Sequence, residues 1–249
     1  MSKARTDVIQ QVIRDRALTL LQQPIVALGD GRVIGREVLT RGPAGPFESP
    51  QRLIKAAFFS SKLEDLETAI CGLAARTALA SFPVSELMFV NVTAAGFAGT
   101  GEALREALSP MPPSRVVIEV TEADRPGGDF VEAAAAWKAA GYGIAIDDVG
   151  AGFSRLLAIA QVRPDWIKID RPLVSGAVDK EHWMAVVRHI VDLGSSIGAQ
   201  VIAEGIETEA ELRAVRSVGI AYGQGYLIAR PAVMRNAEKK GGVSVAYAR

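Results

Sequence analysis

The 249-residue sequence predicts an α/β protein, and within that class a TIM-type (β/α)8 barrel. From residue 87 onward, short apolar strands alternate with polar loops and helices, which is typical of a parallel sheet covered by helices. Two earlier strands and these six give the eight of a closed barrel, a fold that commonly uses about 250 residues. The alternative is an open doubly wound sheet, but no G-x-G-x-x-G motif follows the first strand to support it.

The N-terminal part of the chain predicts a helix over 5–16, because apolar residues recur there at helical spacing. A pair of strands follows at 18–28 and 33–39, separated by a turn at 29–31. Pro24 lies within the first of them and suggests an edge position or the beginning of a strand, since proline cannot donate to a β-ladder.

Helices are expected next over 49–59 and 63–81, after which the regular alternation begins. The six later strands are expected at 87–91, 116–119, 144–147, 166–170, 201–204 and 221–224. The helices between them are expected near 101–108, 129–140, 154–162, 181–197 and 208–218. No stretch resembles a linker, so residues 1–231 are expected to form one domain, with 232–249 as a C-terminal tail.

Composition and charge exclude several classes of function. Lysine plus arginine and aspartate plus glutamate both number 28, which argues against binding to a nucleic-acid polymer or an anionic membrane. The single Cys71 allows no intrachain disulfide, as is usual in a reducing cytosol. No apolar run is as long as the about 20 residues that a helix needs to span a bilayer. We therefore expect a cytoplasmic protein, or the cytoplasmic portion of a larger one, without membrane insertion by this chain.

Two adjacent carboxylates, Asp147 and Asp148, stand where an apolar strand is expected to end, and a glycine-rich loop follows them at 150–152. In an extended strand, neighbouring side chains point to opposite faces, so the two carboxylates should diverge. Holding two acids together is costly unless a cation or a basic group neutralises them. The glycines allow a ligand to approach the main chain closely. The pattern indicates a divalent-metal site.

The other predicted strands also end in polar residues, and in a barrel these ends converge on the functional face. The residues at these ends are Glu37, Asn91, Glu119, Asp147, Asp148, Lys168, Asp170, Glu204 and Gln224. Carboxylate and amide oxygens suit Mg²⁺ or Mn²⁺, whereas a zinc set of histidines and thiols is missing. Helix capping and loop solvation are the alternative for any one position, but the acids together would repel one another without a cation.

Eight sequence blocks carry a family resemblance in their order and spacing. They begin at Gln23-Pro24-Ile25-Val26, Glu37-Val38-Leu39-Thr40-Arg41, Asn91-Val92-Thr93, Glu119-Val120-Thr121-Glu122, Asp147-Asp148-Val149-Gly150, Lys168-Ile169-Asp170, Ala203-Glu204-Gly205-Ile206-Glu207 and Gln224-Gly225-Tyr226. From about residue 8 to 231, the chain resembles the EAL-domain family of cyclic-di-GMP phosphodiesterases.

This resemblance implies a modified (β/α)8 barrel whose first strand is antiparallel to the others. It also implies hydrolysis of one phosphodiester of cyclic-di-GMP to linear pGpG, with Mg²⁺ or Mn²⁺ as one or two bound ions, in a homodimer. Glu37, Asn91, Glu119 and Asp147 resemble the ligands of a first metal, and Asp147 with Asp148 those of a second.

The resemblance also implies roles for the remaining polar positions. Glu204 corresponds to the acid that serves as base or metal ligand for the attacking water, and Lys168 to the residue that positions this water. Glu122 and Glu207 correspond to supporting acids. Gln23, Arg41 and Gln224 correspond to substrate contacts.

Two departures from the family pattern stand out. Glu-Ala-Leu is replaced by Glu37-Val38-Leu39. The loop Asp-Phe-Gly-Thr-Gly-Tyr is replaced by residues 148–153, with Val149, Ala151 and Phe153 as the changed positions. No predicted metal ligand is lost, so an active phosphodiesterase is expected. The alternatives are a catalytically silent cyclic-di-GMP receptor that signals through a partner, and a metal-dependent barrel enzyme of another kind, such as an enolase-like lyase.

Overall fold

A computed structural model describes residues 3–15, 17–99, 101–121, 128–150, 153–178 and 180–234. Glu122, Ala151 and residues 235–249 of the expected tail lie outside the described residues.

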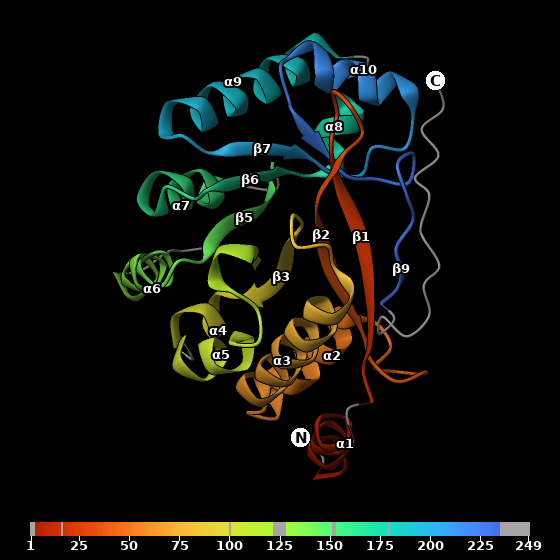
Figure 1. Ribbon diagram of the computed structural model, residues 1–249, viewed down its shortest axis with the longest axis vertical. Helices are drawn as coiled ribbons and strands as arrows, with labels where there is room; N and C mark the ends of the chain where they lie inside the picture. Colours follow the sequence, from red (N-terminus) through yellow and green to blue (C-terminus); the bar gives the residue numbers. More distant parts are fainter. Residues whose placement is uncertain are drawn as a thin grey trace.

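The strands close into a barrel (Figure 1). They are β1 (Thr19–Ala27), β2 (Val33–Arg41), β3 (Leu87–Thr93), β4 (Val116–Thr121), β5 (Gly143–Val149), β6 (Trp166–Ile169), β7 (Gln200–Ala203), β8 (Tyr222–Gly223) and β9 (Ala232–Val233). From β2 to β8 each strand is parallel to the next, and β1 closes the ring by pairing antiparallel with both β2 and β8. The modified barrel is confirmed, and the open doubly wound sheet is excluded.

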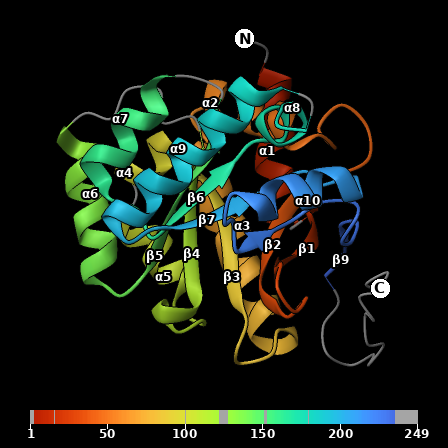
Figure 2. The ribbon, with the colours of Figure 1, turned by 90° about the horizontal axis from the view of Figure 1, so that it is seen from above.

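Helices cover the outside of the sheet, and in both ribbon views α6, α7 and α9 follow one another around it (Figure 2). The α-helices are α1 (Lys3–Arg14), α2 (Pro50–Phe59), α3 (Leu63–Ser81), α4 (Ala94–Gly99), α5 (Gly101–Leu108), α6 (Gly128–Ala139), α7 (Phe153–Val162), α8 (Arg171–Gly176), α9 (Glu181–Ile197) and α10 (Glu209–Ser217). A 3-10 turn, η1 (Pro113–Arg115), precedes β4. The sequence did not predict α4 and α8, which are six residues long and contain the glycine or proline typical of loops.

Pro24 lies inside β1 rather than at its beginning, and β1 has neighbours on both sides, so the expectation of an edge or a strand start was wrong. On one side Pro24 faces Arg36 of β2. On the other side β1 pairs with β9 at Leu21 and Gln22 and with β8 at Val26 and Ala27. Pro24 falls between these two short ladders, where a missing N–H interrupts neither of them.

Ala232 and Val233, the first residues of the expected tail, form β9 and thereby join the sheet. Among the described helices, none is both long and apolar enough to cross a membrane.

The apolar core of the described residues has three clusters. The largest lies between the outer face of the strands and the helices. Another packs α1, α2 and α3 together. The third cluster fills the barrel interior, with one residue from each of six strands: Ile25, Ile34, Phe89, Val117, Ala145 and Ile202. Trp166 of β6 and Tyr222 of β8 pack against it, each with its ring edge-on to a neighbour. This cluster is an apolar plug that closes the barrel beneath its carboxyl-end mouth.

Gly225 fixes how the loop after β8 meets the loop after β7. A Cβ at this position would overlap the backbone nitrogen and oxygen of Ile206, which cannot move as a flexible side chain would. We expect Gly225→Ala to lower the free energy of unfolding by about 1–3 kcal/mol in a denaturant titration, as overpacking does elsewhere. Gly29→Ala is the matched control, because no atom lies within 4 Å of a Cβ there. Equal stability of the two variants would contradict this packing argument.

Candidate active site

The side chains of the site are set by the period-two alternation of the strands. On most parallel strands, the inward-facing site residue lies two positions after a residue of the plug or one that packs against it. The pairs are Gly35 and Glu37, Phe89 and Asn91, Val117 and Glu119, Ala145 and Asp147, Trp166 and Lys168, Ile202 and Glu204, and Tyr222 and Gln224. On β2 the earlier residue is Gly35, which lies against Phe89 of the plug. Glu204 and Gln224 lie just past the ends of β7 and β8. On β1, which runs the other way, Gln23 lies two positions before Ile25. The polar residues therefore form a single layer above the apolar plug.

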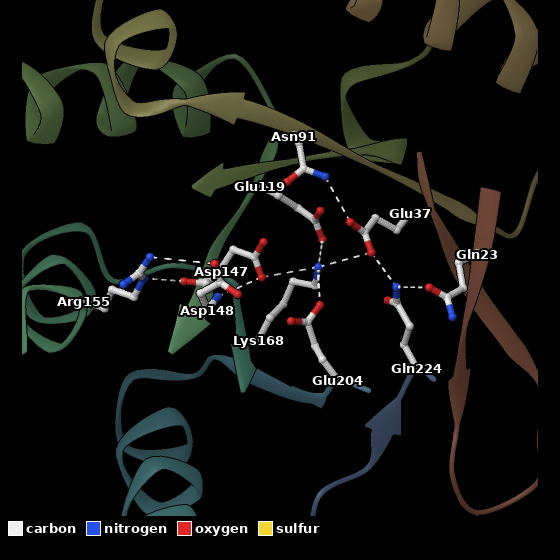
Figure 3. Close-up of polar contacts among 10 residues, drawn as sticks. All are labelled: Gln23, Glu37, Asn91, Glu119, Asp147, Asp148, Arg155, Lys168, Glu204 and Gln224. Atoms are coloured by element: carbon white, nitrogen blue, oxygen red, sulfur yellow. Dashed lines mark hydrogen bonds and ion pairs between the residues drawn. The ribbon is translucent and has the colours of Figure 1, made fainter. Parts of the chain in front are cut away.

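Lys168 is the centre of this layer, with a side chain that is 0% exposed (Figure 3). Its Nζ lies 2.6 Å from Glu204 Oε1 and 2.7 Å from Glu119 Oε1. It also lies 3.5 Å from Asp147 Oδ1 and 3.6 Å from Glu37 Oε2. One ammonium thus contacts four carboxylates that come from β2, β4, β5 and the end of β7. The structure brings these residues together as predicted.

A chain of amide contacts extends the site towards β1. Asn91 Nδ2 donates to Glu37 Oε1 at 3.0 Å, which leaves the amide oxygen of Asn91 as its possible metal ligand. Gln224 Nε2 donates to Glu37 Oε2 and, at 3.0 Å, to Gln23 Oε1. Gln23 in turn donates to the carbonyl oxygen of Ala229 at 2.9 Å. Glu37 is therefore held by hydrogen bonds on both of its oxygens.

Asp147 and Asp148 diverge as predicted, although β5 continues past them to Val149 rather than ending at Asp147. Asp147 points inward to Lys168, whereas the Asp148 side chain is 52% exposed and Asp148 has a positive φ of 53°. Such a backbone conformation is uncommon for a residue other than glycine. The backbone N–H of Asp148 donates to Asp147 Oδ1 at 2.9 Å.

Arg155 is a site residue that the sequence reasoning missed. It lies in the first turn of α7, is 8% exposed, and its Nε donates to the Asp147 carbonyl oxygen at 3.0 Å. One of its terminal nitrogens lies 3.8 Å from Asp148 Oδ2. The available signal was its position as the one charged residue in the otherwise uncharged helix FSRLLAIAQV.

Burial and crowding shift the protonation of the central groups. Burial raises the pKa of Glu119 well above its ordinary value, with Lys168 opposing and Glu37 and Asp147 adding to the rise. Burial likewise raises the pKa of Glu204, with Asp147 adding to this and Lys168 opposing it. For Lys168 burial acts downward, but Asp147, Glu119, Glu204 and Glu37 together raise its pKa well above the ordinary value. The raised pKa of Lys168 favours its charged form, and this one ammonium faces four carboxyl groups.

The donor set fits a hard divalent cation. Glu119 Oε2 is buried and accepts no hydrogen bond from the residues that the structure describes, which is costly for a carboxylate without a cation. Oxygens of Asp147, Asp148 and Glu204 all lie within 4.8 Å of one another. Carboxylate and amide oxygens without histidine or thiolate are the ligands that Mg²⁺ and Mn²⁺ prefer.

The remaining predicted residues lie at the rim or outside the central layer. Glu207 lies in the loop after β7 and forms an ion pair with Arg171 of α8. The next residue, Thr208, forms a capping box with Glu211 at the start of α10. Arg41 lies at the end of β2, half-buried, and donates to the Thr40 carbonyl oxygen at 2.8 Å. Asp170 caps α8 by accepting from the Leu173 N–H, so at this position the capping alternative holds.

Comparison with known proteins shows the family of this barrel. The family model described as "EAL domain" matches residues 6–231. The chain belongs to the EAL-domain family. This EAL domain is 30% identical over 234 residues to the bifunctional diguanylate cyclase/cyclic di-GMP phosphodiesterase MucR of Pseudomonas aeruginosa, a match covering 90% of this chain and 34% of MucR.

Two solved structures of EAL proteins share its fold. The PaMucR phosphodiesterase in its c-di-GMP complex has a TM-score of 0.81 at 29% identity, covering 92% of this chain and 97% of that one. The manganese/cy-diGMP complex of Klebsiella pneumoniae BlrP1 has a TM-score of 0.79 at 29% identity, covering 87% of this chain and 56% of that one. The chain spans 33%, 34% and 44% of the lengths of three curated relatives that it matches.

The raised acid pKa values predict how metal and pH act together on stability. Because folding raises the pKa of Glu119 and Glu204, the metal-free folded state keeps protons that the unfolded chain releases. Their contribution to stability therefore falls as pH rises above about 4.5, the ordinary carboxyl range. A divalent ion such as Mn²⁺ would bind the deprotonated groups, so an increase in Tm caused by Mn²⁺ should grow between about pH 5 and pH 8.

Thermal unfolding with and without saturating Mn²⁺ measures this effect across that pH interval. Glu119→Gln is the control, since it removes one of the titrating groups and should flatten the dependence. An increase in Tm that is equal at both ends of the interval, or larger at the acidic end, would contradict the assignment of the shift to these carboxyl groups.

Proposed function

We propose that this EAL domain hydrolyses one phosphodiester of cyclic-di-GMP to give linear pGpG, using Mg²⁺ or Mn²⁺. The observation that carries the proposal is the buried layer in which Lys168 meets four carboxylates at the barrel mouth. MucR, named as a cyclic di-GMP phosphodiesterase, and the BlrP1 complex with manganese and cy-diGMP support the substrate and the metal.

When bound, the divalent metal would neutralise the phosphodiester and favour deprotonation of the attacking water. We assign Glu37, Asn91, Glu119 and Asp147 to a first ion, and Asp147 with Asp148 to a second. The hydrogen bonds that hold both oxygens of Glu37 orient that ligand in advance of binding.

Glu204 and Lys168 are the residues that we assign to the attacking water. Glu204 is the central acid whose side chain remains 17% exposed, so its free oxygen can face a water that enters the mouth. Burial raises the pKa of Glu204, and a carboxylate of higher pKa is a stronger base for taking a proton from water. Lys168 Nζ, 2.6 Å from Glu204 Oε1, fixes the direction of that carboxylate. The water oxygen forms a bond to phosphorus, and the P–O bond to the leaving sugar oxygen breaks. The sugar oxygen takes up a proton from solvent, to which Glu204 returns its own.

Substrate contacts are assigned to the rim of the layer. Arg41 offers a guanidinium at the end of β2, and a guanidinium can grip a phosphate oxygen through two parallel N–H bonds. Gln23 and Gln224 hold each other at the adjacent edge. We keep Glu122 and Glu207 as supporting acids, the latter through its ion pair with Arg171.

The direct test incubates the purified protein with Mn²⁺ and cyclic-di-GMP and separates the products by chromatography. Wild type should release pGpG, whereas Glu204→Ala should lose turnover by about 100-fold or more, the scale of a general base, while retaining substrate binding. Tight binding without pGpG from wild type would instead identify a silent receptor. Neither binding nor turnover would refute both functions, and near wild-type rates in Glu204→Ala would remove Glu204 from catalysis.

We further propose that the domain acts as a homodimer. Leu156 and Leu157 of α7, the helix that follows the acid pair, are 39% and 45% exposed, which is compatible with burial against a second copy. Light scattering should give twice the 26.4 kDa chain mass, and Leu157→Glu should shift the population towards monomer. A wild-type protein that is monomeric at every concentration tested would refute the dimer.

A further inference from the structure

Arg155 places a second fixed cation in the acidic centre, on the opposite side of Asp147 from Lys168 (Figure 3). Its side chain is 9% exposed, so its charge is poorly screened by solvent. The hydrogen bond from its Nε to the Asp147 carbonyl oxygen anchors the guanidinium to the backbone of β5. Arg155 therefore belongs to the construction of the site.

The backbone that carries Asp148 is also held in place. The N–H of Asp170 donates to the Val149 carbonyl oxygen at 3.3 Å, and Gly150 is packed so closely that a Cβ would overlap Leu173 and Asp170. Asp148 thus has little freedom to move away from the arginine, whose terminal nitrogen lies 3.8 Å from its carboxylate.

The two proposed metal positions differ in their exposure to this charge. The acids assigned only to the first ion, Glu37 and Glu119, have their ion pairs with Lys168. Asp148, assigned to the second ion, has its ion pair with Arg155. A divalent ion at Asp148 would therefore bind a ligand whose charge Arg155 partly neutralises, and it would lie near the guanidinium itself. Among the ion pairs of the described residues, none joins Arg155 to Glu37 or Glu119.

We propose that Arg155 makes the two metal positions unequal, by weakening the one at Asp148 more than the one at Glu37 and Glu119. The inference rests on the proposed metal-dependent function and adds to it the residue that sets the order of metal binding. Because four residues are assigned to the first ion and two to the second, the protein would fill the first position at metal concentrations that leave the second largely empty.

Titration of the purified protein with Mn²⁺ alone tests this, with free Mn²⁺ counted by its paramagnetic resonance signal. Arg155→Gln should tighten the weaker binding event about 3- to 10-fold, the scale for removing one charge beside a partly screened ligand, and leave the tighter event within twofold. Arg155→Lys keeps the charge and should stay near wild type. Arg155→Met should behave as Arg155→Gln, so the outcome does not depend on one replacement.

Two further variants locate the effect. In an Asp148→Asn background, Arg155→Gln should no longer change Mn²⁺ binding, because the ligand through which the arginine acts is gone. Arg32→Gln removes an equal charge at the opposite end of the barrel, where the side chain is 67% exposed, and should bind Mn²⁺ as wild type does.

The outcomes separate the inference from the function on which it rests. A folded Arg155→Gln protein whose weaker Mn²⁺ affinity is unchanged or reduced would overturn the role of Arg155 and leave the metal-dependent function standing. Absence of Mn²⁺ binding from wild type and all variants would overturn both. Equal tightening of both binding events would show a general field and also refute the proposed inequality.

Discussion

The need to neutralise buried carboxylates governs the mouth of this barrel. Lys168 meets that need with a single ammonium that lies within 3.6 Å of oxygens from Glu37, Glu119, Asp147 and Glu204. Burial raises the pKa values of Glu119 and Glu204, and the neighbouring acids, which one positive charge does not balance, add to the rise. A divalent cation would supply the positive charge that is still missing.

The apolar plug makes this arrangement possible. Because most site side chains lie two residues along the chain from a residue of the plug or one that packs against it, the plug determines the depth at which the polar layer stands. Phe89 fills much of that interior, and Gly35 on the neighbouring strand leaves the room that it requires. The rigid apolar floor thus holds charged groups in a fixed array and keeps water to one side of them.

Much of the fold and of the candidate site could be predicted from the sequence. Alternate residues of a strand point to the same face, and the inner faces of all strands in a barrel surround one interior. Polar residues at the ends of these strands therefore converge. The barrel, the convergence of Glu37, Asn91, Glu119, Asp147, Lys168 and Glu204, and the divergence of Asp147 from Asp148 were all predicted. Arg155 was not, because its contact with Asp147 depends on how α7 returns to the sheet. Pro24 was misplaced because its tolerance depends on a gap between two ladders formed by distant segments.

The position of β1 has a consequence for how the chain is made. This strand is synthesised well before one of its neighbours, β8, which lies some two hundred residues further along at Tyr222 and Gly223. Until β8 arrives, the hairpin of β1 and β2 presents an open edge with unpaired N–H and C=O groups, a feature that invites association with other chains. The last strands of the barrel therefore act as a seal, and ribosome-bound or truncated chains that lack them would need protection by chaperones.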